Sequence, residues 1–492
     1  MIEKYQASFK KPAFAHQLVG IERLVSLPFY GLFDEMGAGK SKQVIDAACI
    51  LFEEKAIDTV LVVAPASVRG VWLNPEFGEL VKHAWASSRA SEYHSKGLRQ
   101  SSIFGGPYLD DEEPLQWVVT NYEYIRSEKN LKRLQALLAD RKFMMVLDES
   151  SFIKSRQAKQ TKACLSLAKQ AARRVILNGT PITNSPVDLW SQLNFLSPTI
   201  LPFRNFYAFR ATYAVMGGWQ GKQIVKWQNL DELQKQVAPY VIRREKKDCL
   251  DLPPKTFTQV ECPLTESSWE KYKQMRDECI VWLEENPSMA AQAGVKVMRL
   301  AQITSGLLGG VEGEDLPTTV DIGREKLDLF AEWLQGRLIE EPGLKVIAWC
   351  RFRRQLDRLA TEMKKYVRTY KLQGGQSKED REEAIQAFSR TGSGPGLLCA
   401  QQQAGSFGLN LVAASNVVYL SNDFNLATRL QSEDRVHRPG QTRNVLYVDV
   451  IATGPKGQRT VDHGILAALR KKHDIASWTV SAWREALRED LA

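Results

Sequence analysis

A glycine-rich segment near the start of the 492-residue chain has the residue types needed to hold phosphate groups. Residues 34–41 read DEMGAGKS, after the apolar run FYGLF (29–33) and before a helix-like stretch. Glycines let backbone N–H groups approach a phosphate closely, and the N-terminus of a following helix favours negative charge. Lys40 is then expected on the β- and γ-phosphates and the Ser41 hydroxyl on Mg²⁺. The alternative is a turn that only caps the helix, since Asp34 replaces the first glycine of the strict pattern.

An acidic pair ends a later apolar run. The run FMMVL leads directly into Asp148 and Glu149. A carboxylate at a strand end can complete the coordination of Mg²⁺, and its neighbour can polarise a water molecule for hydrolysis of a nucleoside triphosphate. Alone, such an ending is usually a solvated strand end. Together with the phosphate loop, it predicts that Asp148 binds the metal ion and that Glu149 acts on water.

Two arginines lie far along the chain, in the segment QSEDRVHRPGQ (431–441). Arg435 and Arg438 are three positions apart, so on a helix they would share one face. Guanidinium groups can stabilise the charge that develops on a transferred γ-phosphate. A solvated basic face is the commoner meaning of an isolated pair. Beside the other two motifs, the pair predicts a second contribution to the same ATP site.

Parallel sheets are expected to position these groups. Through residue 200, short apolar runs such as VLVVAP (60–65) alternate with amphipathic stretches, which predicts a doubly wound α/β sheet. Polar and aromatic residues at helical spacing follow, and apolar runs return from KVIAWC (345–350) onward. We therefore expect an ATP-binding lobe at 1–200, helical insertions and a link at 201–320, and a second α/β lobe at 321–492.

Composition excludes several classes of protein. Apolar residues make up 44% and charged residues 25% of the chain, which is typical of globular proteins. Neither an apolar run of the roughly 18 residues that a membrane helix needs nor an N-terminal signal region is visible. The seven cysteines are scattered and the six histidines form no metal motif, so we expect a reducing cytoplasm and neither disulfides nor zinc. The net charge of +9 is compatible with a polyanionic partner.

Taken in order, the motifs resemble the Swi/Snf-like branch of superfamily-two helicase-like ATPases. The resemblance covers nearly the whole chain, and its segments are FAHQLVGIERL (14–24), DEMGAGKS (34–41), APASVRGVW (64–72), TNYEYI (120–125), DESSFIKS (148–155), LNGTPITNSPVDLWSQLNFL (177–196), VIRREKKDCLDLPPK (241–255), KVIAWCRFRRQLDRL (345–359), SFGLNLVAASNVVYLSNDFN (406–425), QSEDRVHRPGQT (431–442) and TVDHGILAALRKK (460–472). It implies two tandem RecA-like parallel-sheet lobes with helical insertions between the motifs.

The resemblance also assigns roles to residues. The catalytic set is Lys40, Asp148, Glu149, Arg435 and Arg438. The ATP-binding set is Gln17, Gly37, Ala38, Gly39, Lys40, Ser41 and Gln431, with Gln17 reading adenine, and the metal ligands are Ser41 and Asp148. The expected DNA contacts are Ser67, Trp72, Thr120, Lys154, Arg351, Arg353 and Arg354. Coupling between lobes is assigned to Thr180, Gly408 and Asn410. Further basic residues that could hold DNA phosphates are Arg243, Arg244, Lys246 and Lys247.

The implied function is a DNA-stimulated ATPase that uses ATP and Mg²⁺ to track along double-stranded DNA without reading its sequence. We expect a monomer with no membrane association, from the cytoplasm of a prokaryote or a virus-infected cell, that remodels forks, anneals strands or displaces proteins. Ser150 and Ser151 replace the family's usual Ala-His, and the histidine that Ser151 replaces is the residue tied to coupling of hydrolysis. This departure favours one alternative, an ATP-gated DNA clamp or adaptor with slow hydrolysis. A strand-separating helicase with a hairpin wedge within 200–320 is the other.

Overall fold

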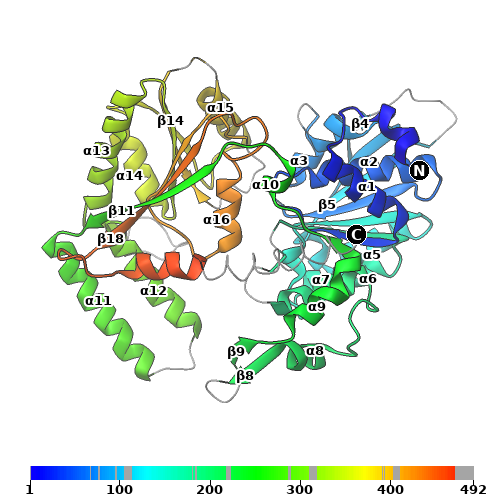
Figure 1. The fold of residues 1–492 in the computed structure, drawn as a ribbon, viewed down its shortest axis with the longest axis horizontal. Helices are drawn as coiled ribbons and strands as arrows, with labels where there is room; N and C mark the ends of the chain where they lie inside the picture. The colour runs from blue at the N-terminus through cyan, green and yellow to red at the C-terminus, as the bar shows by residue number, and fades with distance from the viewer. Residues whose placement is uncertain are drawn as a thin grey trace. The chain divides into compact units, whose positions relative to one another are not determined.

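The computed structural model describes two compact units of the chain (Figure 1). The described residues are 2–66, 68–75, 78–94, 97–104, 113–179, 181–182, 186–217, 223–285, 290–309, 319–390, 392, 394–402 and 410–470. The first unit extends to Asp251 and the second runs from Leu252 to Lys471. The segment 201–320, in which we expected helical insertions and a link, is therefore divided between the two units.

The first unit is built on an eight-stranded sheet with the order β10-β1-β7-β6-β2-β5-β3-β4. Neighbouring strands are parallel except for the β3–β4 pair. The strands are β1 Phe29–Leu32, β2 Thr59–Ala64, β3 Ser88–His94, β4 Gly97–Phe104, β5 Leu115–Asn121, β6 Phe143–Asp148, β7 Arg173–Leu177 and β10 Val241–Ile242. The antiparallel β3–β4 extension was not predicted, because residues 88–104 contain no continuous apolar run.

Helices cover both faces of this sheet, which explains why its strands are apolar on both sides. In β2, Val60 and Val62 pack into one hydrophobic cluster, while Leu61 and Val63 pack into another. The helices of this unit are α1 Ala15–Ser26, α2 Lys40–Glu53, α3 Arg69–Leu73, α4 Glu79–His83, α5 Glu128–Leu138, α6 Lys159–Ala168, α7 Leu189–Leu196, α8 Phe206–Tyr213, α9 Leu230–Val237 and α10 Lys246–Cys249, with single 3₁₀ turns that include Ser150–Ile153. An antiparallel hairpin, β8 Ala214–Gly217 with β9 Gln223–Trp227, lies between α8 and α9.

The second unit contains a six-stranded sheet, ordered β11-β18-β17-β14-β16-β15, in which all neighbours are parallel. Its strands are β11 Lys255–Pro263, β14 Lys345–Cys350, β15 Arg368–Leu372, β16 Gly396–Gln401, β17 Asn416–Tyr419 and β18 Val445–Thr453. Its helices are α11 Glu266–Glu285, α12 Ala290–Thr304, α13 Glu325–Glu340, α14 Arg353–Met363, α15 Lys378–Ser389 and α16 Leu426–Glu433, and a short pair joins β12 Leu307–Leu308 to β13 Val320–Asp321. The expected fold class, two α/β units on parallel sheets, is confirmed. No helix in the described ranges has the length and apolar character needed to cross a membrane.

Candidate active site

The phosphate loop lies between β1 and α2, as the motif predicts. Gly37 and Gly39 both have φ of +82°, a left-handed conformation that side chains with a Cβ rarely adopt. Gly39 is also the residue that precedes the first turn of α2. A Cβ on Gly39 would lie 2.2 Å from Nε2 of Gln17, so glycine is required here for space as well as for backbone geometry.

Gln17 is fastened to this loop. Its Nε2 donates to the carbonyl of Ala38 at 3.2 Å, and its Oε1 accepts from the N–H of Phe14 at 3.1 Å. His16 bonds to the same Ala38 carbonyl at 3.0 Å, and burial lowers its pKa below the ordinary value. The structure thus brings Gln17 together with Ala38 and Gly39.

The side chain of Lys40 forms hydrogen bonds within the phosphate loop. Its Nζ donates to the carbonyl oxygens of Asp34 at 2.7 Å and of Glu35 at 3.3 Å. An ammonium group on carbonyl oxygens can exchange these partners for phosphate oxygens, because both are hydrogen-bond acceptors. Ser41 follows in the first turn of α2. The loop therefore holds a lysine and a hydroxyl next to a helix N-terminus.

Asp34, the residue that departs from the strict loop pattern, forms a buried ion pair. Its carboxylate accepts from Nε and Nη2 of Arg244 at 2.9 and 2.7 Å, and it has no solvent exposure. Gln43 on α2 also donates to it, at 3.2 Å. Arg244 further donates to the carbonyl of His16. Sequence reasoning missed this pair, since nothing local to either residue indicates the other.

The segment that contains Arg244 runs alongside the phosphate loop. β10 pairs with β1, and the hydrogen bonds continue past the strands, from Phe33 N–H to the Ile242 carbonyl at 2.7 Å and from Glu35 N–H to the Arg244 carbonyl at 2.9 Å. The Glu35 carboxylate then accepts from the Lys246 N–H at 2.8 Å. The backbone of residues 241–246 is therefore tied to the loop.

This placement corrects part of the expected DNA surface. Arg244 is engaged with Asp34, and Lys246 is only 2% exposed. Burial also lowers the pKa of Arg243 to about 10. Of the four basic residues expected here, at positions 243, 244, 246 and 247, only Lys247 is well exposed. Its side chain pairs with Glu245.

Asp148 lies at the end of β6, where three groups hold it. Its Oδ2 accepts from the indole N–H of Trp72 at 2.9 Å, and its Oδ1 accepts from the N–H of Glu149 at 3.0 Å. The hydroxyl of Tyr122 donates to its carbonyl at 2.8 Å. Burial raises the pKa of Asp148, against the lowering effects of the Trp72 hydrogen bond and the positive charge of Lys40. The positive charge of Lys40 therefore favours the ionised form of the Asp148 carboxyl.

Glu149 has a strained backbone. Its φ of +52° and ψ of 55° place it in the left-handed region, where only three non-glycine residues are found in the described part of the chain. Such a conformation costs about 1–3 kcal/mol and persists only where surrounding contacts impose it. Strain of this kind concentrates at functional sites.

The arginine segment in the second unit is not helical, which corrects our expectation. α16 ends at Glu433, so Arg435 and Arg438 lie in the turns that follow it, while Gln431 lies in its last turn. Backbone bonds fix these turns: the Leu411 N–H donates to the Arg435 carbonyl at 2.9 Å, and the Gln441 N–H donates to the Arg438 carbonyl at 3.0 Å. Both arginine side chains are partly exposed.

Residues at the start of the second unit hold the same segment. His437 Nε2 bonds to the carbonyl of Pro253 at 2.7 Å, and Lys255 lies 3.6 Å from Glu433 and 3.8 Å from Asp434. Sequence reasoning gave His437 little weight. Its bond shows that the segment is anchored where the chain enters the unit.

A buried arginine fixes α16 itself. Arg429 donates to both carboxylate oxygens of Asp449, at 2.5 and 3.1 Å, and to Glu433 at 2.8 Å. Its guanidinium carbon lies 3.5 Å from the centre of the Tyr419 ring. Its charge is therefore compensated by two carboxylates and an aromatic face. This network was also missed, because its members come from separate elements.

Comparison with known proteins identifies the family of the chain. A family model described as the SNF2-related domain matches residues 30–307, more than half of the chain, and the helicase conserved C-terminal domain matches residues 325–440. The chain belongs to the SNF2-related family. Membership confirms the expected resemblance to the helicase-like ATPases.

Relatives of this SNF2-related chain are larger proteins. It is 27% identical to the chromatin structure-remodeling complex subunit snf21 of Schizosaccharomyces pombe, over 95% of this chain and 39% of that protein. It is 28% identical to the transcription regulatory protein SNF2 of Saccharomyces cerevisiae, over 95% of this chain and 28% of that protein. The chain thus spans well under half the length of these relatives. Both are eukaryotic, so they do not support the expected prokaryotic or viral source.

A solved structure was also matched. The Sulfolobus solfataricus SWI2/SNF2 ATPase core in complex with double-stranded DNA is 25% identical, with a TM-score of 0.42, over 97% of this chain and 95% of that one.

Two residues expected to contact DNA are buried away from it, and a third, Arg354, stays a prediction. Trp72 and Thr120 are fully buried, and the Thr120 hydroxyl donates to the Tyr93 carbonyl at 3.1 Å. A buried indole cannot stack on a base, so we assign Trp72 to the support of Asp148. Arg354 is exposed but makes two bonds to Asp321, at 3.2 and 3.0 Å.

The remaining expected residues stay predictions. Arg353 is exposed, Lys154 is partly buried, and Arg351 is largely buried with Asp423 at 3.8 Å. Asn410 is exposed. Ser67, Thr180 and Gly408 lie outside the described residues.

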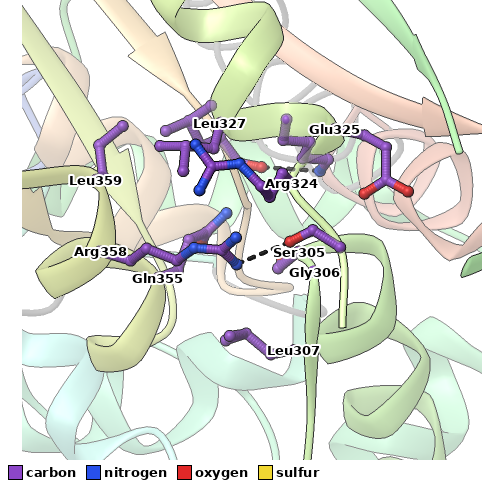
Figure 2. A pocket seen from close by; sticks show the side chains of 12 residues that line it. Ser305, Gly306, Leu307, Arg324, Glu325, Leu327, Gln355, Arg358 and Leu359 are labelled. Atoms are coloured by element: carbon purple, nitrogen blue, oxygen red, sulfur yellow. Dashed lines mark hydrogen bonds between the residues drawn. The ribbon is translucent and has the colours of Figure 1, made fainter. Parts of the chain in front are cut away.

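A small pocket of about 20 Å³ in the second unit lies between α13, α14 and the turn after α12 (Figure 2). Its basic groups are already engaged. Arg358 donates to the Gly323 carbonyl at 2.7 Å, and Lys326 donates to the Leu420 carbonyl at 2.8 Å and to Asp462 at 2.6 Å. None of the expected site residues lines it, so we assign it a structural role.

Proposed function

We propose that this chain is the motor core of an ATP-driven translocase on double-stranded DNA. The observation that carries the proposal is the division of the ATP motifs between two units. The phosphate loop and Asp148 belong to the first, while Arg435 and Arg438 belong to the second. Hydrolysis then requires both units to act on one nucleotide, which provides a way to link hydrolysis to motion between them.

In the first unit, Lys40 exchanges its two carbonyl partners for phosphate oxygens when ATP binds. The Ser41 hydroxyl and the Asp148 carboxylate are hard oxygen ligands, the type that Mg²⁺ prefers together with phosphates and water. When bound, Mg²⁺ neutralises charge on the phosphates. Glu149 orients the attacking water and accepts its proton at the carboxylate. Gln17, which its hydrogen bonds hold against the loop, contacts the adenine of ATP.

In the second unit, the arginine turns are held in advance of catalysis. Arg435 and Arg438 stabilise charge that develops on the γ-phosphate, a role for which planar guanidinium groups suit better than lysine. Gln431, one turn earlier, is proposed to contribute to ATP binding. We propose that the turns need little rearrangement, since the carbonyls of both arginines are already bonded within the unit.

We propose double-stranded DNA as the partner, bound through phosphates without sequence preference, by a monomer. The names of relatives support DNA: one is a "Probable ATP-dependent DNA helicase" of Arabidopsis thaliana, 27% identical over 95% of this chain and 42% of that protein. Fork remodelling, strand annealing and displacement of bound proteins are the tasks we propose for such a motor.

Six described cysteines are free thiols, which supports a reducing compartment such as the cytoplasm.

One feature favours the alternative of a strand-separating helicase. The β8–β9 hairpin lies within the range where we expected that a wedge could be found. Residues 218–222, which join the two strands in the sequence, lie outside the described residues.

The test is the rate of ATP hydrolysis against duplex length at a fixed concentration of DNA ends. A tracking motor gives a rate that rises with length and then levels off, whereas a static clamp, the alternative that the Ser150-Ser151 departure favours, gives none of this rise. Lys40→Ala serves as the control for contaminating ATPases and should lose at least about 100-fold in rate. The proposal would be overturned if the wild-type ATPase rate changed neither on addition of DNA nor with duplex length.

A further inference from the structure

Ser150, directly after Glu149, makes a hydrogen bond that crosses from the acidic strand end to another element. Its side chain is fully buried, and its hydroxyl donates to Oε1 of Gln192 on α7 at 2.6 Å. The Ser150 hydroxyl oxygen in turn accepts from Nδ2 of Asn178 at 3.4 Å. Asn178 follows β7, so one hydroxyl joins the ends of β6 and β7 and the helix α7.

Gln192 is fixed by its other atoms. Its Nε2 donates to the carbonyl of Pro181 at 2.8 Å and to that of Asp188 at 2.9 Å, and the residue is fully buried. The amide group therefore has a defined orientation, with Oε1 toward Ser150. An alanine at 150 would leave this buried acceptor without the Ser150 donor, and an unsatisfied buried acceptor is unfavourable.

The bond acts where the backbone is strained. Glu149, next in the chain to Ser150, has φ of +52°, and its N–H also donates to the carboxylate of Asp148. A residue in this conformation must be held by its surroundings. The Asp148 carboxylate holds it on one side, and the buried Ser150 hydroxyl fixes the next residue.

We infer that Ser150 and Gln192 are positioning residues for Glu149 and tie its placement to Asn178 and to the Pro181 carbonyl. The inference rests on the proposed function, because Glu149 has its role only if the chain hydrolyses ATP. It also gives the Ser150 departure a purpose. In this chain the residue after Glu149 provides a link to α7 through its own hydroxyl.

The experiment compares Ser150→Ala with Ser151→Ala. Ser151 is the adjacent, partly exposed serine, and its replacement makes the same chemical change. With saturating duplex DNA, Ser150→Ala should lower kcat at least tenfold, while KM for ATP and half-saturating DNA change less than threefold. Ser151→Ala should behave like the wild type. A purely structural role would lower the melting temperature without this selective loss of kcat.

Gln192→Met removes the acceptor of the same hydrogen bond. It therefore tests the inference if Ser150→Ala does not fold. It should lower kcat similarly, and the double variant should be no slower than the slower single one, since both remove one interaction. A wild type that shows no DNA-stimulated hydrolysis would defeat the proposed function. If DNA stimulates the wild type and folded Ser150→Ala has the same kcat, this inference alone is overturned. If Ser150→Ala does not fold, the same comparison is made with Gln192→Met.

Discussion

The acidity of Asp148 is set by residues that lie far from it in the chain. Burial raises its pKa, and the N–H of Trp72 opposes that rise. A raised pKa means that protons compete with Mg²⁺ for the carboxylate at higher pH than at an ordinary aspartate. The apparent affinity of the ATPase for Mg²⁺ should therefore fall as the pH falls, so more Mg²⁺ is needed for the same rate.

Trp72→Phe tests this effect. Loss of the N–H should raise the pKa of Asp148 further, so the variant should need more Mg²⁺ than the wild type at pH 6. A hydrogen bond of about 1 kcal/mol corresponds to roughly a fivefold change. At pH 8 the difference should shrink, because protons compete less for the carboxylate in both proteins as the pH rises. The measurement is the Mg²⁺ concentration for half-maximal ATPase rate at each pH.

Trp117→Phe is the matched control. Trp117 is equally buried, packs 6.5 Å from Trp72 between ring centres, and bonds to Ser88 instead of Asp148. Trp117→Phe should lose as much packing from the smaller ring as Trp72→Phe does. It should not raise the Mg²⁺ requirement at pH 6. Equal behaviour of the two variants at pH 6 would contradict the role given to the indole N–H.

Arg435 and Arg438 carry the second prediction at this scale. Replacing either with alanine should lower the DNA-stimulated ATPase rate by about 10³–10⁵-fold, the range for arginines that stabilise phosphoryl transfer. ATP affinity should change far less, because the phosphate loop is in the other unit. Arg438→Lys should recover little activity, since a point charge does not reproduce the planar group.

Arg443→Ala is the control for loss of one positive charge nearby. Arg443 is well exposed and pairs with Glu341. Its replacement should leave turnover within about twofold. Turnover at the wild-type level in both Arg435→Ala and Arg438→Ala would contradict the two-unit ATPase.

At the scale of elements, β10 and the residues after it stabilise the phosphate loop. Arg244→Ala leaves Asp34 buried without its ion-pair partner, and breaking a buried pair in this way costs about 3–5 kcal/mol of unfolding free energy. Urea unfolding followed by tryptophan fluorescence measures this loss. Lys247→Ala, three residues along and largely exposed, should change stability by less than about 0.5 kcal/mol. A loss below about 1 kcal/mol in Arg244→Ala would mean that β10 is not held through Asp34.

At the scale of the whole molecule, the net charge of +9 and the proposed contacts with phosphates predict a steep dependence on salt. If six to ten phosphates are contacted, affinity for duplex DNA should fall by about 10³–10⁵-fold between 50 and 200 mM salt. Fluorescence anisotropy with two unrelated duplex sequences measures this fall and tests sequence independence together. A fall of less than tenfold would leave too few phosphate contacts for a tracking motor.

The sequence by itself determined the parts that depend on neighbouring residues. The loop at 34–41 was predicted because its glycines, lysine and serine are contiguous, and the parallel sheets because buried strands are continuous apolar runs. The assignment of Lys40, Ser41, Asp148 and Glu149 to the ends of their elements follows from the same local order.

The tertiary structure decided everything that depends on distant pairs. Asp34 and Arg244 are 210 positions apart, and Trp72 and Asp148 are 76 apart, so no local pattern shows that they meet. Basic and aromatic residue types likewise do not reveal burial, which is why Arg244 and Trp72 were expected on a DNA surface. The end of α16 at Glu433 was missed for a related reason. Its following turns are fixed by hydrogen bonds to other segments, among them Leu411 and Pro253, rather than by helical spacing.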